Sequence, residues 1–226
     1  MAAVLCIDFD SAVLEQDILP GIAHEFAGTS VRELEEELEA GELSREQFSA
    51  EVIDRIQAGE QELVDYALSI ATVRPGLLEL LDWTHWNDWE PVVLATGWDL
   101  YVNPILERAG ADRVVRHCGR ARFTYRWRAR YLSPRGIEVV DGFKLAYAAT
   151  YRDQGDFVVY IGGSAGDEDA ARVAHAIFAR DGLLEAIQGA HDRVFAFETF
   201  DDVRTILERD AGTWLESFSS TTAAEG

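Results

Sequence analysis

Three short apolar runs constrain the fold of this chain more than any other feature. They cover residues 3–7, 91–95 and 157–161, and none of them alternates with polar residues. A run of this length that is apolar on both faces is typical of a strand buried within a parallel sheet. The segments between the runs carry helical patterns. The sequence therefore predicts an α/β fold with a mainly parallel sheet and helices on both of its faces.

Residues 17–73 form a block with a helical pattern and no strand signal. Ser30 with Glu33, and Ser44 with Gln47, are capping-box pairs that mark the starts of two helices. Apolar residues recur at helical spacing after each pair, and the end of the block predicts a third helix. We expect this block to be a small helical insert that follows the first strand.

The remainder of the chain is expected to form one core domain and a short tail. The core takes residues 1–16 and 74–217, which contain the strand signals. Residues 121–131 alternate strictly between aromatic and mostly arginine side chains, as a half-exposed strand does. The turn that follows predicts a hairpin over about residues 121–140. The tail, residues 218–226, is small and polar and is predicted to be disordered.

Composition argues against several classes of partner and location. The formal net charge is -21, which argues against general binding to nucleic acid or to an anionic membrane. No window approaches the ~20 apolar residues of a membrane span, and the N-terminus has no basic region typical of a signal peptide. Cys6 and Cys118 are too few for a disulfide framework. These features predict a cytoplasmic protein.

Candidate functional residues follow the carboxyl ends of the three buried strands. Asp8 and Asp10 follow the first, Thr96 and Gly97 the second, and Asp167 lies in the loop after the third. Ligands of an open parallel sheet bind beyond these strand ends. We therefore expect these residues to converge, although they are far apart in the sequence.

Lys144 is the only lysine among 20 lysine and arginine residues. A compact ammonium and a planar guanidinium are not interchangeable at a crowded charged site, so a single lysine in an arginine-rich chain indicates a functional role. A lysine, two carboxylates, a hydroxyl and an acidic loop suit Mg²⁺-assisted phosphoryl transfer. Hard cations take oxygen ligands, and the transferred group needs its charge neutralised.

The order and spacing of these residues resemble the four motifs of the haloacid dehalogenase superfamily. The matching segments are residues 7–11, 94–97, 142–144 and 160–167. The resemblance covers nearly the whole chain and is closest to the branch of phosphoserine phosphatases and methionine-salvage phosphatases. It implies a Rossmann-like core with a helical cap, and hydrolysis of a small phosphorylated metabolite by a Mg²⁺-dependent monomer or homodimer.

The resemblance also implies a role for each candidate residue. Asp8 would be the nucleophile that forms an aspartyl-phosphate, and Asp10 the general acid and base. The residues implied to hold the phosphoryl group are Thr96, Gly97 and Lys144. The residues implied to bind Mg²⁺ are Asp8, Asp10 and Asp167.

Departures from the motifs leave two questions open. Gly163 occupies the first acidic position of motif four, so a chain that kept the fold but lost turnover is the alternative. Such a protein would bind a phosphorylated ligand or a protein partner. In motif two, either Ala95 or Thr96 takes the hydroxyl's position, and we favour Thr96. A phosphotransferase or a dehalogenase would use the same nucleophile, but Lys144 and the acidic loop argue against the dehalogenase.

The arginine side of residues 121–131 has two interpretations. It is either an anion-binding face or an exposed strand face whose charges pair with the protein's own carboxylates or with those of a second subunit. We favour the second, because surface arginines usually have no further role. The aromatic side is expected to be core or dimer contact, and it consists of Phe123, Tyr125, Trp127 and Tyr131.

Overall fold

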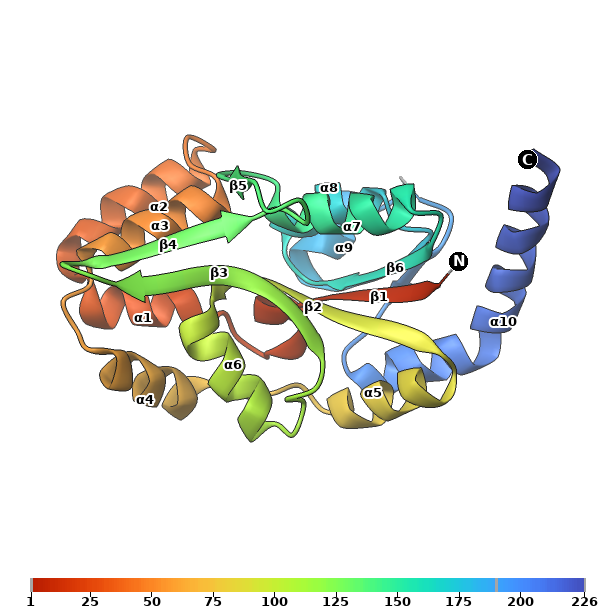
Figure 1. Cartoon of the computed structure of the whole chain (residues 1–226), viewed down its shortest axis with the longest axis horizontal. Coiled ribbons are helices and arrows are strands. Elements are labelled where there is room, and N and C mark those ends of the chain that lie inside the picture. Colours follow the sequence, from red (N-terminus) through yellow and green to blue (C-terminus); the bar gives the residue numbers. More distant parts are fainter. Residues whose placement is uncertain (1, 190, 226) are drawn as a thin grey trace.

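An eight-stranded sheet forms the centre of the protein in the computed structural model, which describes residues 2–189 and 191–225 (Figure 1). The strand order is β5-β4-β3-β2-β1-β6-β7-β8. The six strands β3, β2, β1, β6, β7 and β8 pair with their neighbours in parallel. The pairs β3–β4 and β4–β5 are antiparallel. The strands are β1 Ala3–Asp8, β2 Trp89–Trp98, β3 Val115–Phe123, β4 Trp127–Leu132, β5 Glu138–Val139, β6 Phe157–Gly162, β7 Ala176–Ala179 and β8 Val194–Ala196.

β1 shows why the predicted runs are apolar without interruption. It pairs with β2 on one side and β6 on the other, so the three predicted runs form the middle of the sheet. Leu5 and Ile7 pack into one apolar layer, and Val4 and Cys6 pack into the other. Neither face of the strand is left for polar residues. The predicted α/β fold with a mainly parallel sheet is confirmed.

Helices cover both faces of the sheet. Those in the layer of Leu5 and Ile7 are α5 (Leu77–Trp86), α6 (Asp99–Arg108) and α10 (Phe200–Glu225). Those in the layer of Val4 and Cys6 are α7 (Phe143–Asp153), α8 (Glu168–Arg172) and α9 (Asp181–Ile187). Two apolar layers thus enclose the strands and fix the strand ends that carry the candidate site.

Four of the α-helices between β1 and β2 lie within residues 17–73, and in Figure 1 they gather at the end of the molecule opposite α10. They are α1 (Ile18–Phe26), α2 (Val31–Glu39), α3 (Arg45–Arg55) and α4 (Glu60–Ile70). The predicted capping box of Ser44 and Gln47 starts α3. The two ends of the insert meet where Leu14 bridges to Val73. We therefore propose that residues 17–73 act as a cap.

The prediction of one strand over residues 121–131 is wrong. β3 ends at Phe123, β4 begins at Trp127, and the two pair antiparallel across a turn in which Thr124 N donates to Arg126 O at 3.2 Å. The turn has none of the usual Gly, Pro, Asn or Asp residues, so the alternation hides it. The predicted turn after residue 132 is present and joins β4 to β5.

The turn also separates the aromatic residues into two environments. Trp127 and Tyr131 are buried, as the core interpretation expects, whereas Phe123 and Tyr125 are exposed at the end of the hairpin. Tyr131 donates from its hydroxyl to Ser49 Oγ in α3 at 2.7 Å, and Trp127 Nε1 donates to Ala58 O at 3.0 Å. The hairpin therefore packs on the helical insert rather than standing apart from it.

The predicted disorder of residues 218–226 is also wrong for the residues that the structure describes, since α10 continues to Glu225. Phe218 stacks edge-on against Phe157 and His175, with ring centroids 5.4 and 4.7 Å away. The hydroxyls of Ser219 and Ser220 bond to carbonyls four residues earlier. The helix thus continues through a small, polar sequence, with Phe218 packed on the aromatic residues of the core. Among residues 2–189 and 191–225, no helix combines the length and apolar character that a bilayer span requires.

Candidate active site

The first strand ends in a tight turn that positions two carboxylates. Asp8 ends β1, and residues Phe9–Val13 form a single π-helical turn, a rare element that is frequent at functional sites. The Asp8 carboxylate caps this turn by accepting from Ser11 N and Ser11 Oγ, both at 2.6 Å. Asp10 lies within the turn and is buried. The sequence of β1 and this turn thus brings both predicted catalytic carboxylates to one strand end.

Lys144 joins the ends of β1 and β6. Its helix α7 begins after Gly142, which has the left-handed conformation (φ 69°) that glycine adopts without strain. The Lys144 ammonium donates to Asp8 Oδ1 and to Asp167 Oδ1, the latter at 2.7 Å. Burial alone would lower the pKa of Lys144, but Asp167 and Asp8 raise it above its ordinary value. Lys144 is therefore a buried cation shared by two carboxylates.

Asp167 has hydrogen-bond donors at both of its oxygens. Oδ1 accepts from Lys144 and, at 2.9 Å, from the Tyr160 hydroxyl. Oδ2 accepts from Ser164 N at 3.0 Å, from the Ser164 and Ser11 hydroxyls at 3.2 Å and from Gly163 N at 3.3 Å. Burial raises the pKa of Asp167, but Lys144 and these donors hold it below its ordinary value. In this geometry Asp167 orients the lysine and the loop, and its binding to Mg²⁺ stays a prediction.

The carboxyl group of Asp10 has fewer hydrogen-bond partners than that of Asp8. Its Oδ1 atom is buried and has no hydrogen-bond partner among the described residues. Burial raises the pKa of Asp10 well above its usual range, and the charges of Asp17 and Asp8 raise it further. A carboxyl group whose pKa is raised keeps its proton to higher pH than usual and is better able to give that proton to a leaving oxygen. The geometry therefore agrees with the role of general acid that the sequence predicts.

Asp10→Asn is expected to stabilise the folded protein near neutral pH and to have no effect near pH 3. The folded pKa of Asp10 exceeds its unfolded value of about 4. The folded state therefore binds the extra proton between these two values, and stability falls as pH rises through that window. The substitution removes this fall, a gain of about 1–3 kcal/mol.

Urea unfolding at several pH values in EDTA measures this effect. Asp153→Asn, at an exposed position of α7, is the control. Equal changes at low and neutral pH would contradict the assignment of a raised pKa to Asp10.

Thr96 and Gly97 lie near the end of β2, as predicted. Thr96 lines the cavity in front of Lys144, whereas Ala95 is fully buried in the apolar core. This difference supports Thr96 over Ala95 as the residue that holds a phosphoryl group, and that role stays a prediction. Gly97 has a packing constraint of its own, because a Cβ atom there would lie 2.0 Å from Tyr101 Oη.

Gly97→Ala is expected to destabilise the protein by at least about 1–3 kcal/mol, the usual cost of overpacking a core. The added methyl would also lie 2.5 Å from Tyr101 Cζ, so the ring or the strand must move. Thermal unfolding measures the loss. Gly212→Ala in α10 meets no atom within 4 Å and should instead stabilise by about 1 kcal/mol through helix propensity. Equal unfolding temperatures for the two variants would contradict the packing argument.

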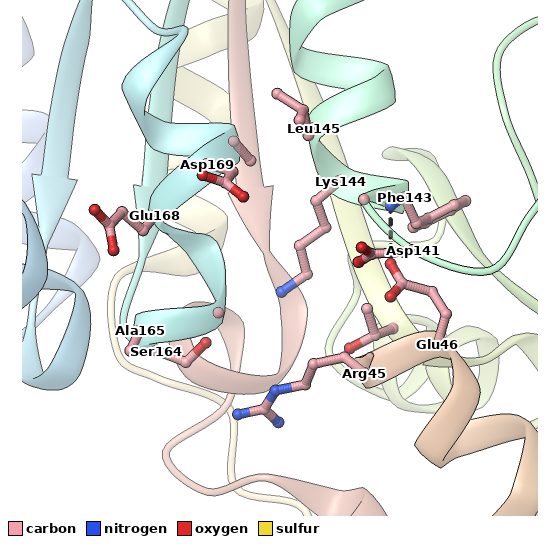
Figure 2. A pocket seen from close by; sticks show the side chains of 14 residues that line it. Arg45, Glu46, Asp141, Phe143, Lys144, Leu145, Ser164, Ala165, Glu168 and Asp169 are labelled. Atoms are coloured by element: carbon pink, nitrogen blue, oxygen red, sulfur yellow. Dashed lines mark hydrogen bonds between the residues drawn. The ribbon is translucent and has the colours of Figure 1, made fainter. Parts of the chain in front are cut away.

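A cavity of about 270 Å³ lies between the insert and the core, in front of these residues. Figure 2 shows Lys144 from α7 and Arg45 from α3 pointing into the same space. Thr96, Ser164 and Gly166 also line it. The lining also carries the carboxylates Glu46, Asp141, Glu168 and Asp169, so a small anionic ligand would bind on the side of Lys144 and Arg45.

The side chains of the site offer few ligands for Mg²⁺. Among the described residues, no group of three or more His, Cys, Asp or Glu side chains is arranged to hold a metal ion. Gly163 adds no ligand, and a Cβ atom there would lie 2.7 Å from Ser11 O. Asp8 and Asp10 remain, and the Oδ1 of Asp10, which has no partner among the described residues, would act as a ligand only in the ionised carboxylate. Because Mg²⁺ commonly takes one or two carboxylates plus substrate phosphate, these residues fit an ion whose coordination the substrate completes.

Sequence reasoning missed several residues that shape the site. Ser11 links Asp8, Asp167 and Gly163 through one hydroxyl, and its place directly after the aspartate pair was the available signal. Arg45 comes from the insert, and no spacing in the sequence connects it with the strand ends. Arg74 is buried and donates to Ala12 O at 2.8 Å and Leu14 O at 2.9 Å, which fixes the chain after the π-helical turn.

The arginines of the hairpin pair with carboxylates of the same chain. Arg122 pairs with Asp99 at 2.8 Å, and both Arg126 and Arg128 pair with Asp54 of α3. Arg130 lies 3.8 Å from Glu138. For these four residues the interpretation as a surface face with internal ion pairs is confirmed, and such exposed pairs contribute little stability individually.

The chain matches a family model of hydrolases and several phosphatases. A family model described as haloacid dehalogenase-like hydrolase matches residues 5–172. The 2-hydroxy-3-keto-5-methylthiopentenyl-1-phosphate phosphatase of Bacillus cereus strain AH187 is 27% identical over 214 residues, covering 91% of this chain and 95% of that one. The corresponding phosphatase of Bacillus anthracis is 26% identical over the same shares of the two chains.

Solved structures show the same fold. A phosphoserine phosphatase described as a phospho-aspartyl intermediate analogue superposes with a TM-score of 0.67 at 19% identity, covering 91% of this chain and 98% of that one. A probable phosphoserine phosphatase from Vibrio cholerae gives a TM-score of 0.69 at 18% identity, covering 92% of this chain and 64% of that one. At these identities the likeness concerns the fold alone.

Proposed function

Because this chain belongs to the haloacid dehalogenase-like hydrolase family, we propose that it is a Mg²⁺-dependent phosphatase that hydrolyses a small phosphorylated metabolite. The observation that carries the proposal is the buried triad of Asp8, Lys144 and Asp167 beside Asp10, whose Oδ1 has no hydrogen-bond partner in the part of the chain that the structure describes. The lysine offsets charge around the nucleophile, and Asp10 has the raised pKa that an acid needs.

The proposed reaction has two steps. In the first, a carboxylate oxygen of Asp8 bonds to phosphorus while the ester P–O bond breaks, and Asp10 gives its proton to the leaving oxygen. In the second, Asp10 takes a proton from a water molecule that attacks the phosphorus of the aspartyl-phosphate, which frees Asp8 and inorganic phosphate. Thr96, Gly97 and Lys144 would hold the phosphoryl oxygens.

The proposed metal site consists of Asp8 and Asp10, with Asp167 as the predicted third residue. Bound there, Mg²⁺ would neutralise charge on the phosphoryl group. Substrates suggested by the relatives' names are 2-hydroxy-3-keto-5-methylthiopentenyl-1-phosphate and phosphoserine. Cys6 and Cys118 are unpaired, which supports a reducing, cytoplasmic location. Whether the chain is a monomer or a homodimer stays a prediction.

Hydrolysis of p-nitrophenyl phosphate and of small phosphorylated metabolites, with Mg²⁺ and with EDTA, tests the proposal. We expect turnover that EDTA abolishes. The alternative is a silent protein that binds a phosphorylated ligand or a protein partner, and the observation that favours it is Gly163 at a position for a metal carboxylate. Phosphate binding without turnover across the panel would select this alternative.

A further inference from the structure

Arg45 is the basic side chain that the insert contributes to the cavity. It begins α3, and in Figure 2 its side chain crosses from that helix toward Ser164 and the loop after β6. The loop makes room for it at Gly166, where a Cβ atom would lie 3.3 Å from Arg45 Nε. The guanidinium therefore lies across one side of the cavity that Lys144 enters from the other.

A phosphate ester that enters this cavity needs protein cations as well as Mg²⁺, because four carboxylates, Glu46, Asp141, Glu168 and Asp169, also line it. A phosphate monoester carries about two negative charges near neutral pH. Lys144 is shared by two carboxylates, so its charge is already offset. Arg45 has a single recorded carboxylate partner, Asp17, at the long distance of 3.3 Å, and its side chain is 41% exposed.

Geometry favours exchange of this partner for a phosphate. A guanidinium presents a planar fork of N–H donors that matches phosphate oxygens, and it is more weakly hydrated than an ammonium. The Asp17 carboxylate does not depend on Arg45 for its position, because its Oδ1 accepts from Leu19 N at 3.0 Å as the N-cap of α1. Arg45 can thus leave Asp17 while α1 keeps its cap.

We propose that Arg45 binds phosphoryl oxygens of the substrate from the cap side, leaving Asp17 when the phosphate enters. The inference rests on the proposed function and adds a cap residue to the phosphate site. Because Arg45 belongs to the insert and Lys144 to the core, a bound phosphate would hold the two parts together. Phosphate occupancy would thereby close the cap over the cavity.

Titration of the full chain with inorganic phosphate in Mg²⁺, by calorimetry, tests the proposal with a readout that does not depend on turnover. Arg45→Gln should weaken phosphate binding by about 10-fold or more, and Arg45→Lys should weaken it less, since the charge remains. Asp17→Asn should tighten binding several-fold, because asparagine also caps helices and no longer competes for Arg45. Arg32→Gln, on an 85% exposed cap arginine paired with Glu36, should change nothing.

The two substitutions are expected to change phosphate affinity in opposite directions, Arg45→Gln lowering it and Asp17→Asn raising it. This distinguishes a phosphate ligand from an ion pair that only holds the cap in place. If the pair served only to hold the cap, both substitutions would weaken phosphate binding in the same direction, and the proposal would be overturned. Wild-type affinity in Arg45→Gln would overturn it as well. If that variant does not fold, Asp17→Asn and Arg45→Lys decide, and unchanged affinity in both sinks the proposal.

The two proposals fail separately. If wild-type protein hydrolyses phosphate esters while Arg45→Gln binds phosphate normally, only the role of Arg45 is wrong. If wild-type protein binds phosphate, Arg45→Gln weakens it and no ester is hydrolysed, only the phosphatase proposal is wrong. A wild-type protein that binds no phosphate and hydrolyses no ester contradicts both.

Discussion

Asp8→Asn is expected to lower the hydrolysis of p-nitrophenyl phosphate by at least about 10⁴-fold, the scale of losses seen when a nucleophile is removed. An amide cannot form the acyl-phosphate that the proposed first step requires. The side chain keeps its size, and its single amide oxygen can accept either from Ser11 or from Lys144, whereas Asp8 accepts from both. The loss should therefore appear in kcat rather than through unfolding. The measurement is kcat and KM with Mg²⁺, beside Asp153→Asn as an exposed control.

Asp8→Asn should leave the stability of the folded protein unchanged or raise it, although it lowers activity. In the wild-type protein one buried ammonium faces two buried carboxylates, Asp8 and Asp167. Asp8→Asn leaves a neutral pair of Lys144 and Asp167, which removes one uncompensated buried charge. We expect an unfolding temperature equal to or above that of the wild type, as occurs when an active site stores strain or charge. Activity retained at a tenth of wild type or more would rule out Asp8 as the nucleophile.

The sheet and the aspartate pair were predictable because their signals are local. An unbroken apolar run can be satisfied only where both faces are buried, and β1, β2 and β6 are such strands. Their carboxyl ends meet at one edge, so residues that follow them converge without any knowledge of side-chain packing. Lys144 was predictable for a chemical reason, since an ammonium and a guanidinium are not interchangeable at a crowded charged site, and a single lysine among many arginines therefore indicates a functional role.

What the sequence hid are contacts between distant segments. The turn at residues 124–126 has no turn-forming residue, and it forms because Trp127 and Tyr131 pack against α3 and its flanks. The last residues of α10 read as a polar tail, but Phe218 reaches the ring of Phe157. Such tertiary contacts override local composition.

In the candidate site, too, the sequence locates the residues but does not predict their contacts. The sequence placed Asp167 in an acidic loop, and the resemblance to the family implied a role in binding the metal. In the structure Asp167 accepts from a lysine, a tyrosine hydroxyl and backbone donors. That network depends on Tyr160 within β6 and on Ser11 across the site, and no periodicity in the sequence links these residues. Motif reasoning locates a residue, whereas its partners decide its role.

Lys144→Met is expected to lower the free energy of unfolding by about 3–5 kcal/mol, as removal of one partner from a buried ion pair does. It would also reduce hydrolysis to background. Asp8 and Asp167, both almost fully buried, would face each other without a cation. Their pKa values in the folded state would then rise above the unfolded value of about 4. The destabilisation should be full near neutral pH and should fade as pH falls toward that unfolded value.

Two further variants separate the charge of Lys144 from its shape. Lys144→Arg keeps the cation but replaces three rotatable donors with a rigid fork, so we expect smaller destabilisation with hydrolysis still lost. Lys144→Met with Asp167→Asn leaves only Asp8 ionised, so the double variant should be more stable than the sum of the single losses predicts by about 0.5–3 kcal/mol. Urea unfolding near pH 4 and pH 7 measures both effects. Additive losses would mean that Lys144 and Asp167 do not interact, because an ammonium shared between two buried carboxylates cannot be removed without changing what each carboxylate costs.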